Sequence, residues 1–535
     1  MGSRVLDPYS RMGKGRVRDA GHRVPYKYCM HDRLEALESP KAVTPHPSLL
    51  AVLILGFALA SACQVGESPT GATAAPPNLV VIFTDDQGWA DIGTQGAEGF
   101  RTPHLDRLAL EGTRFSDFYV AQPVCSASRA ALLTGCYPNR IGIHGALGPR
   151  VNHGIHADET TLAELCKSRG YATGMFGKWH LGHHPQFLPA RHGFDESYGI
   201  PYSNDMWPWH PDFARFTDPV ERRKKAWPDL FTFEGDSVAD PEITPEDQMG
   251  FTRDFGARAV DFIERHAGEP FFLYLAHPMP HVPLFTDPSS KGRSAQGAYG
   301  DVIEEIDDSV GAVLDALEEN GVADNTLVLY MSDNGPWLSY GDHAGSTGPL
   351  REGKGTTFEG GVRVPCLARF PGRIPAGRVC DEPWMTIDIL PTIAGLIGAE
   401  LPARTIDGLD VWPILRGDPE AASPHEAYYF WYHTNQLESL RSGPWKLHFA
   451  HGYRSMKGRE LGSGGTPGQY QYGVQIPLSL YNLREDIGES RDVAAEHPEV
   501  LERLLSLGNA MRVRLGDERT NVTGQENRPA GQLGE

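Results

Sequence analysis

Two short apolar runs, each followed by acidic residues, constrain the fold of this 535-residue chain more than any other feature. They are LVVIF (residues 79–83) and LVLYM (residues 327–331). Continuous apolar, β-branched runs of this length are typical of strands that are covered on both faces in a parallel sheet. Helix-like segments lie between them, such as residues 102–112, where we expect Thr102 as the N-cap before Pro103. Alternating strands and helices predict an open α/β sheet, which binds ligands at the carboxyl ends of its strands.

The length of the chain favours one large domain and one smaller domain. We predict that residues 1–76 are a leader, a signal or lipoprotein-type segment and a tether, and that residues 77–400 form the large domain. Residues 401–535 alternate short strands with turns and end in a helix, which predicts an α+β subdomain. Within this part, the Gly-rich residues 451–473 are long enough for a loop at the rim of a functional site and do not read as core.

The N-terminal region predicts export. The run LLAVLILGFALASAC (residues 49–63) is shorter than the roughly 20 residues of a membrane-spanning helix and reads as a secretory signal. Small residues before Cys63 also fit a bacterial lipoprotein site, so simple cleavage and lipidation of Cys63 both stay open. We expect a periplasmic protein, a membrane-anchored lipoprotein or a secreted protein. The formal net charge of -20 disfavours nucleic acid as a partner.

Export permits disulfides, but the pairing of cysteines cannot be deduced from the sequence. Four cysteines are candidates for disulfides or for buried free thiols: Cys136, Cys166, Cys366 and Cys380. Cys125 lies in the stretch PVCSASRAALLTG, directly before a helix-like run. This cysteine is a buried thiol, a disulfide partner or a reactive centre.

The residues that follow the two apolar runs suggest a metal site. Asp85 and Asp86 follow the first run, and Asp333 and Asn334 follow the second. Carboxylates at one sheet edge repel one another unless a cation lies between them. All-oxygen ligands suit Ca²⁺, with Mg²⁺ or Mn²⁺ as the alternative. The competing interpretation is that these residues only end strands in turns.

Basic side chains follow other apolar strands or lie in glycine-rich loops. They are Arg129, Lys178, His180, His277, His281, Arg351 and Lys354. Lys178 and His180 are two residues apart and would share a face if the chain is extended there. Together with a divalent cation, such a set would form a pocket for a tetrahedral oxyanion such as sulfate or phosphate.

At this point the sequence resembles the type I, formylglycine-dependent sulfatases. VCSASRAALLTG is similar to their signature C-x-(P/A)-x-R, with Ala127 where Pro is commoner. The stretches FTDDQGWADIG, GKWHLG, SDNG and HGFDESYGIPYSND also resemble blocks of this family, especially of arylsulfatase A and galactosamine-6-sulfatase-like enzymes. The resemblance implies an alkaline-phosphatase-like fold, with a large mixed, mostly parallel sheet sandwiched by helices and a smaller C-terminal antiparallel sheet plus helix.

The resemblance also implies a role for each site residue. Ca²⁺ would be held by Asp85, Asp86, Asp333 and Asn334, with the oxygen of the formylglycine made from Cys125 nearby. Arg129 and Lys178 would steady the formylglycine and the sulfate oxygens, and His180 would contact the second hydroxyl of the aldehyde hydrate. Ser203, His281 and Lys354 would bind the sulfate and the leaving oxygen. His277 is secondary or structural, and Arg351 is a rim or structural residue.

The function implied is the hydrolysis of aryl or sugar sulfate monoesters to alcohol and inorganic sulfate. One hydroxyl of the hydrate attacks sulfur, His281 with Lys354 protonates the leaving oxygen, and His180 accepts the proton that regenerates the aldehyde. A formylglycine-generating or anaerobic sulfatase-maturing enzyme would be a partner. Two alternatives remain, which are a phosphomonoester or phosphonate hydrolase of the same superfamily and a non-catalytic protein that binds sulfated glycans.

Overall fold

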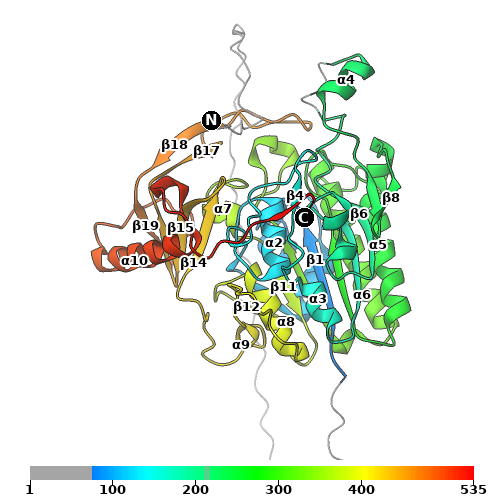
Figure 1. Cartoon of the computed structure of the whole chain (residues 1–535), viewed down its shortest axis with the longest axis horizontal. Coiled ribbons are helices and arrows are strands. Elements are labelled where there is room, and N and C mark those ends of the chain that lie inside the picture. The colour runs from blue at the N-terminus through cyan, green and yellow to red at the C-terminus, as the bar shows by residue number, and fades with distance from the viewer. Residues whose placement is uncertain (1–74, 211–212, 214–215, 535) are drawn as a thin grey trace, which may run out of the picture. The chain divides into compact units, whose positions relative to one another are not determined.

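A ten-stranded sheet organises the computed structural model, which describes residues 75–210, 213 and 216–534 (Figure 1). In spatial order the strands are β12 (Arg378–Cys380), β2 (Thr113–Phe115), β11 (Cys366–Arg369), β10 (Thr326–Ser332), β1 (Asn78–Thr84), β9 (Phe271–Ala276), β5 (Ala172–Lys178), β6 (Glu196–Ile200), β7 (Thr232–Glu234) and β8 (Ser237–Asp240). The five central strands, from β10 to β6, are parallel. Antiparallel neighbours flank them at β11 and β7. The predicted mixed, mostly parallel sheet is confirmed.

Strand β1 shows why its sequence is apolar at every position. Leu79, Val81 and Phe83 belong to the hydrophobic core on one face of the sheet. Val80 and Ile82 belong to the core on the other face. Because side chains alternate along a strand, a strand with a core on both sides needs a continuous apolar run. The strands predicted from the two apolar runs are confirmed as β1 and β10.

Helices cover both faces of the sheet (Figure 1). Those that contribute to one core are α1 (Pro103–Glu111), α5 (Pro245–His266) and α6 (Ala298–Glu319). Those that contribute to the other are α2 (Cys125–Thr134), α3 (Leu162–Lys167) and α8 (Ile389–Ile397). Thr102 is the N-cap residue of α1, as predicted, but its hydroxyl accepts a hydrogen bond from the Gly93 N–H at 2.8 Å instead of capping the helix.

A smaller antiparallel sheet follows, as the resemblance implied. Its strands are β14 (Tyr428–Tyr432), β15 (Gln436–Ser442), β16 (Trp445–His448) and β19 (Ser479–Asn482). Helix α10 (Pro498–Leu515) packs on β15, and β17 (His451–Ser455) pairs with β18 (Gln471–Ile476) in a separate hairpin. The small sheet is tied to the rest by buried ion pairs, including Lys446 Nζ to Glu359 Oε1 at 2.7 Å. The hydrophobic core under the small sheet is continuous with a core of the large sheet. The domain boundary near residue 400 therefore stays a prediction.

The remaining α-helices and strands are short. They are the helices α4 (Pro219–Lys225), α7 (Glu359–Val362) and α9 (Trp412–Leu415), and the two-stranded pairs β13 (Trp384–Met385) with β3 (Phe118–Tyr119) and β20 (Gly531–Gln532) with β4 (His153–Gly154).

All five cysteines in the described residues are buried free thiols, so none of the candidate disulfides is present there. Residues 1–74 of the predicted leader, including Cys63, lie outside the described residues. The helices of the described residues all lack the combined length and apolarity that a membrane span requires.

Candidate active site

The acidic residues that follow β1 and β10 meet at one edge of the sheet. The two strands are parallel neighbours whose last residues, Thr84 and Ser332, are paired. The backbone N–H of Asp86 donates to Asp333 Oδ1 at 3.2 Å, and Asn334 Nδ2 donates to Asp86 Oδ1 at 2.6 Å. Asp85, the other residue of the first pair, is fully buried beside them. The sheet therefore brings together the four predicted oxygen ligands, although they come from positions more than 240 residues apart.

Cys125 is the first residue of α2 and is buried against this carboxylate cluster. Its Sγ lies 3.5 Å from Asp85 Oδ1. Burial raises the pKa of the Cys125 thiol, and the negative charge of Asp85 raises it further, although Lys178 and Lys354 oppose the shift. The thiol is therefore protonated at neutral pH and is a poor nucleophile in this form.

Two buried cations, Arg129 and Lys178, contact the carboxylates of the cluster. Arg129, one turn along α2, donates through Nε and Nη2 to Asp333 Oδ2 at 3.0 and 2.8 Å. Lys178, the last residue of β5, donates to Asp85 Oδ2 and lies 3.3 Å from Ser203 Oγ. Burial alone would raise the pKa of Asp85, but Lys178, followed by His281 and Arg129, holds it well below the usual range. Asp85 therefore stays charged at neutral pH. Burial and the charge of Asp85 raise the pKa of Asp333 to about 7, although Arg129 and Lys178 oppose the shift.

Lys354 and His281 also contact the cluster, at Asp86. Lys354 Nζ donates to both oxygens of Asp86, at 2.6 and 2.9 Å, and lies 3.5 Å from Cys125 Sγ. His281 Nε2 lies 3.7 Å from Asp86 Oδ2 and 3.5 Å from Ser203 Oγ. The predicted substrate-binding groups Lys178, Ser203, His281 and Lys354 thus lie around the carboxylate cluster and Cys125.

His180 reaches the site in a different way from the one expected. Strand β5 ends at Lys178, and His180 has a φ of 62°, so the two residues do not share a face of an extended strand. The fully buried ring of His180 lies 3.0 Å from the Leu147 carbonyl oxygen through Nε2, and Nδ1 has no hydrogen-bond partner among the described residues. Asp86 also has a positive φ, of 66°. A left-handed backbone at such residues costs about 1–3 kcal/mol and clusters at functional sites.

Two of the basic residues lie outside the cluster. His277 Nε2 lies 3.2 Å from Ser309 Oγ on α6, and burial lowers the pKa of His277 to about 3. Arg351 donates to the Glu489 carbonyl oxygen at 2.7 Å and to the Tyr453 hydroxyl at 2.9 Å. These contacts are structural, because the first joins the end of β9 to α6 and the second joins the loop before α7 to the C-terminal part.

Three residues near the cluster were not predicted from the sequence. Asp205 is buried two residues after Ser203, and its Oδ1 has no hydrogen-bond partner among the described residues. The ring of Trp337 lies 4.7 Å from Lys354 Nζ and 5.6 Å from the His281 ring. Arg454 of β17 donates to the Lys354 carbonyl oxygen at 2.7 Å. Asp205 and Trp337 lie in or beside the stretches that resemble the family, whereas no motif marks Arg454.

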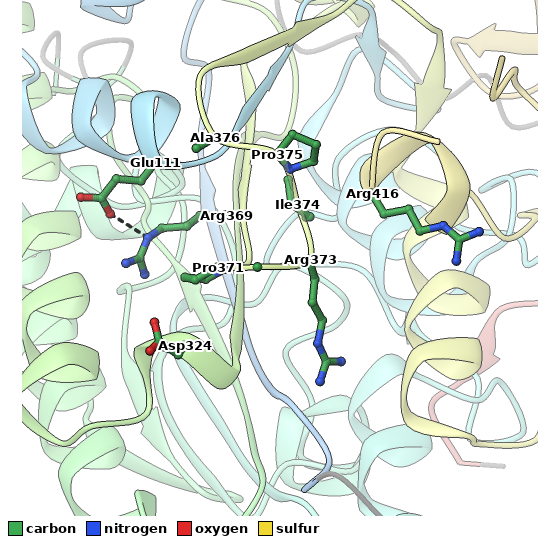
Figure 2. A pocket seen from close by; sticks show the side chains of 10 residues that line it. Glu111, Asp324, Arg369, Pro371, Arg373, Ile374, Pro375, Ala376 and Arg416 are labelled. Atoms are coloured by element: carbon green, nitrogen blue, oxygen red, sulfur yellow. Dashed lines mark ion pairs between the residues drawn. The ribbon is translucent and has the colours of Figure 1, made fainter. Parts of the chain in front are cut away.

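A cavity of about 600 Å³ lies elsewhere, between the loop after β11 and the start of β10 (Figure 2). Glu111, Asp324, Arg369 and Arg416 are among its lining residues. Arg369 pairs in register with Val328, near the beginning of β10, whereas the acidic cluster follows the end of β10. This cavity therefore belongs to the opposite end of the sheet and holds none of the predicted site residues.

The donor set at the cluster fits a divalent cation. Ligand atoms of Asp85, Asp86, Cys125 and His281 lie within 4.8 Å of one another. The Oδ1 atom of Asn334 is buried and has no hydrogen-bond partner among the described residues. An unpaired buried amide oxygen beside three carboxylates is the arrangement expected when a hard cation is the missing partner.

Comparison with known proteins identifies the family. Residues 77–399 match the model of the sulfatase family, and residues 423–532 match that of the C-terminal region of aryl-sulfatase. The chain belongs to the sulfatase family. It is a sulfuric ester hydrolase, and its sheet, helices and small C-terminal sheet form the alkaline-phosphatase-like fold of that family.

Relatives of this sulfatase match most of its length. It is 38% identical to arylsulfatase A of Bos taurus over 450 residues, which are 80% of this chain and 85% of the relative. It is 38% identical to N-acetylgalactosamine-6-sulfatase of Sus scrofa over 460 residues, 82% of this chain and 85% of the relative. The crystal structure of PsFucS1 sulfatase from Pseudoalteromonas sp. is similar with a TM-score of 0.73 at 29% identity, and the match covers 82% of this chain and 90% of that one.

Proposed function

We propose that this enzyme hydrolyses sulfate monoesters through a formylglycine made by oxidation of Cys125, with a bound Ca²⁺ ion. The observation that carries the proposal is the position of Cys125, which is buried at the start of α2 between Asp85 and Lys354. The thiol has a raised pKa and is a poor nucleophile. A formylglycine hydrate would supply a hydroxyl nucleophile and a second hydroxyl through which the product is released.

The metal would be held by Asp85, Asp86, Asp333 and Asn334. Three carboxylates and an amide oxygen favour Ca²⁺, with Mg²⁺ as the alternative. When bound, the ion would lower the pKa of a coordinated hydroxyl and neutralise negative charge on the sulfate. Lys354 and Lys178 donate to Asp86 and Asp85, so both ammonium groups lie next to the proposed ligands.

The remaining residues have roles that follow from their positions. Arg129 fixes Asp333 and thereby the geometry of the proposed metal site. Lys178, Ser203 and Lys354 provide donors to the sulfate oxygens, as their convergence on Cys125 and Asp85 supports. His281, whose Nε2 lies 3.5 Å from Ser203 Oγ, would protonate the leaving oxygen. His180 Nδ1, which has no hydrogen-bond partner among the described residues, would accept a proton from the second hydroxyl.

A sulfated sugar is the substrate class that we propose. The relative from Sus scrofa is named for a sulfated N-acetylgalactosamine, and this chain matches it over most of its length. We further propose that the protein is exported, on the basis of the signal-like residues 49–63, and that a formylglycine-generating or anaerobic sulfatase-maturing enzyme acts on it. The export proposal includes two ways of processing the signal, which are simple cleavage and lipidation of Cys63.

Mass spectrometry of the peptide that contains Cys125 tests the proposal. In active protein the peptide is expected to be about 18 Da lighter than the unmodified sequence, because formylglycine replaces cysteine. The variant Cys125→Ala is expected to lose hydrolysis of nitrophenyl sulfate. Cys136→Ala is the matched control, since Cys136 is also buried but lies away from the cluster, next to Arg528. Active protein with an intact thiol at position 125 would overturn the proposal.

The same assay separates sulfate from phosphate. Nitrophenyl phosphate presents a similar tetrahedral anion, and we expect the enzyme to prefer the sulfate ester. A clear preference for phosphate would favour the phosphomonoester or phosphonate hydrolase instead.

A further inference from the structure

The β17–β18 hairpin is fixed against the catalytic part of the molecule. The segment between its strands docks on the short helix η6 (Leu338–His343). Gly462 N and Gly468 N both donate to the Ser339 carbonyl oxygen, at 2.9 and 2.7 Å, and Ser463 Oγ donates to Asp342 at 2.8 Å. The hairpin therefore presents its side chains at a defined place beside Trp337, the residue that precedes η6.

Arg454 on β17 lies next to the proposed reaction centre. Its Nη2 donates a hydrogen bond to the carbonyl oxygen of Lys354. The Nζ of the same lysine lies 3.5 Å from Cys125 Sγ. The guanidinium carbon lies 5.9 Å from the Trp337 ring and 4.6 Å from the Tyr470 ring. The Cβ of any residue replacing Gly355, which has a φ of 76°, would come within 2.4 Å of Arg454 Nη2, so only glycine leaves room for the guanidinium here.

The guanidinium has unused hydrogen-bonding capacity. Its Nε is buried and has no hydrogen-bond partner among the described residues. Among the described residues, the groups that stabilise the positive charge of Arg454 are tyrosine phenols and, more weakly, Asp86. Asp86 already accepts a hydrogen bond from Lys354. A buried donor on a charged group is costly when it has no partner, and a guanidinium binds planar or tetrahedral anions with two parallel hydrogen bonds.

We propose that Arg454 binds a second negative charge on the alcohol half of the substrate, a carboxylate or a second sulfate. This inference rests on the proposed function and extends it, because it assigns polyanionic sulfated saccharides as the preferred substrates. The ester sulfate would lie among Lys178, Ser203 and Lys354. The second anionic group would lie next to it, at Arg454 on β17, which is hydrogen-bonded to the Lys354 carbonyl oxygen. Trp337, whose ring is half-buried between His281 and Arg454, would form the wall between the two positions.

The test compares three substrates of the matured full-length enzyme. They are a disaccharide with one sulfate and no other charge, the same disaccharide with a second sulfate, and its uronic-acid counterpart with one sulfate. The wild type is expected to show a kcat/KM about 10-fold or more higher for at least one doubly charged substrate, as a charge-assisted hydrogen bond predicts. The two doubly charged substrates distinguish a sulfate from a carboxylate as the preferred group.

The variant Arg454→Gln is expected to remove this preference, mainly through KM, and to change kcat/KM for the singly charged substrate by about 3-fold or less. Arg454→Lys keeps the charge but not the planar fork and is expected to retain part of the preference. Arg459→Gln is the matched control, because Arg459 is exposed on the same hairpin and donates to the Gln469 carbonyl oxygen. It is expected to behave as the wild type does.

Two results would overturn the inference. An equal loss on all three substrates in Arg454→Gln would mean that Arg454 only positions Lys354. Equal kcat/KM values for the three substrates in the wild type would mean that no second charge is recognised, whatever the variants do. Neither result affects the proposed function, which fails instead if the matured wild type hydrolyses none of the three substrates or nitrophenyl sulfate.

Discussion

Lys354 Nζ donates hydrogen bonds to both carboxylate oxygens of Asp86, at 2.6 and 2.9 Å. A single ammonium group therefore neutralises one of the proposed metal ligands while it lies 3.5 Å from Cys125 Sγ. A divalent ion at the cluster would share this carboxylate with Lys354. Metal binding and the position of Lys354 are thus expected to depend on each other.

Removal of metal is expected to lower both activity and stability. A ligand that binds only the folded state stabilises it by about 2.7 kcal/mol at a concentration about 100 times its Kd. Chelation should therefore lower the melting temperature and the rate of sulfate release, and added Ca²⁺ should restore both.

The variant Asn334→Ala tests the ligand set, because it removes the amide oxygen that has no partner in the described residues. We expect it to weaken the rise in melting temperature with Ca²⁺. Asp324→Asn, an exposed site at the other end of the sheet, should respond as the wild type does. Identical Ca²⁺ responses in Asn334→Ala and the wild type would contradict the assigned site.

Replacement of His281 is expected to slow hydrolysis in a way that depends on the leaving group. General acid catalysis contributes about 10²–10⁴-fold, and it matters most when the leaving oxygen is strongly basic. His281→Gln should therefore lose far more kcat on a sugar sulfate than on nitrophenyl sulfate. The control His277→Gln alters a buried histidine that contacts Ser309, and its losses should be the same on both substrates. Equal losses in His281→Gln would argue against the proton-donor role.

Arg129→Gln is expected to destabilise the fold as well as inactivate the enzyme. Arg129 and Asp333 are both fully buried, and their closest contact is 2.8 Å. Removal of one partner leaves a buried charge and costs about 3–5 kcal/mol of unfolding free energy. Urea denaturation measures this loss. Arg191→Gln breaks an ion pair with Asp236 that is exposed on both sides, and its cost should be below about 1 kcal/mol. Similar losses in the two variants would show that Arg129 is not a structural cation.

Glu438 is expected to make stability fall as pH rises. Burial raises the pKa of Glu438 from 4.5 to about 8, against the opposing effects of a hydrogen bond from Thr357 and the charge of Arg519. Asp517 raises the pKa slightly, and the His451 ring faces the carboxyl at 3.5 Å with a pKa lowered by burial to about 3. Between pH 4.5 and 8 the folded state therefore binds more protons than the unfolded state, so this group destabilises the fold as pH increases.

The variant Glu438→Gln tests this by mimicking the protonated side chain. The unfolding free energy of Glu438→Gln minus that of the wild type should increase steadily from pH 5 to about pH 8, which is the pKa of Glu438 in the folded state. Urea titrations at several pH values measure the difference. Glu426→Gln alters an exposed carboxyl and should leave the pH dependence unchanged. A constant difference between Glu438→Gln and the wild type across this range would contradict the assignment.

Local structure was predictable from the sequence wherever short-range chemistry decides it. The apolar runs at β1 and β10 became buried parallel strands, because a strand between two cores needs apolar residues on both sides. Cys125 begins α2, as the helix-like run after it predicts. Lys178 and His180 were expected to share a face only if the chain is extended there. The structure does not meet this condition, because β5 ends at Lys178 and His180 has a left-handed backbone.

The sequence by itself indicated the kind of chemistry, since the motif around Cys125 places the chain in the sulfatase family and the acidic strand ends predict a cation site. Only the tertiary structure decided which residues share that site. Arg129 meets Asp333 across 204 positions of the chain, His277 packs against α6 instead, and Arg454 reaches Lys354 from a hairpin of the C-terminal part. Such contacts depend on how strands and hairpins pack in space, and residue spacing along one chain carries no record of that packing.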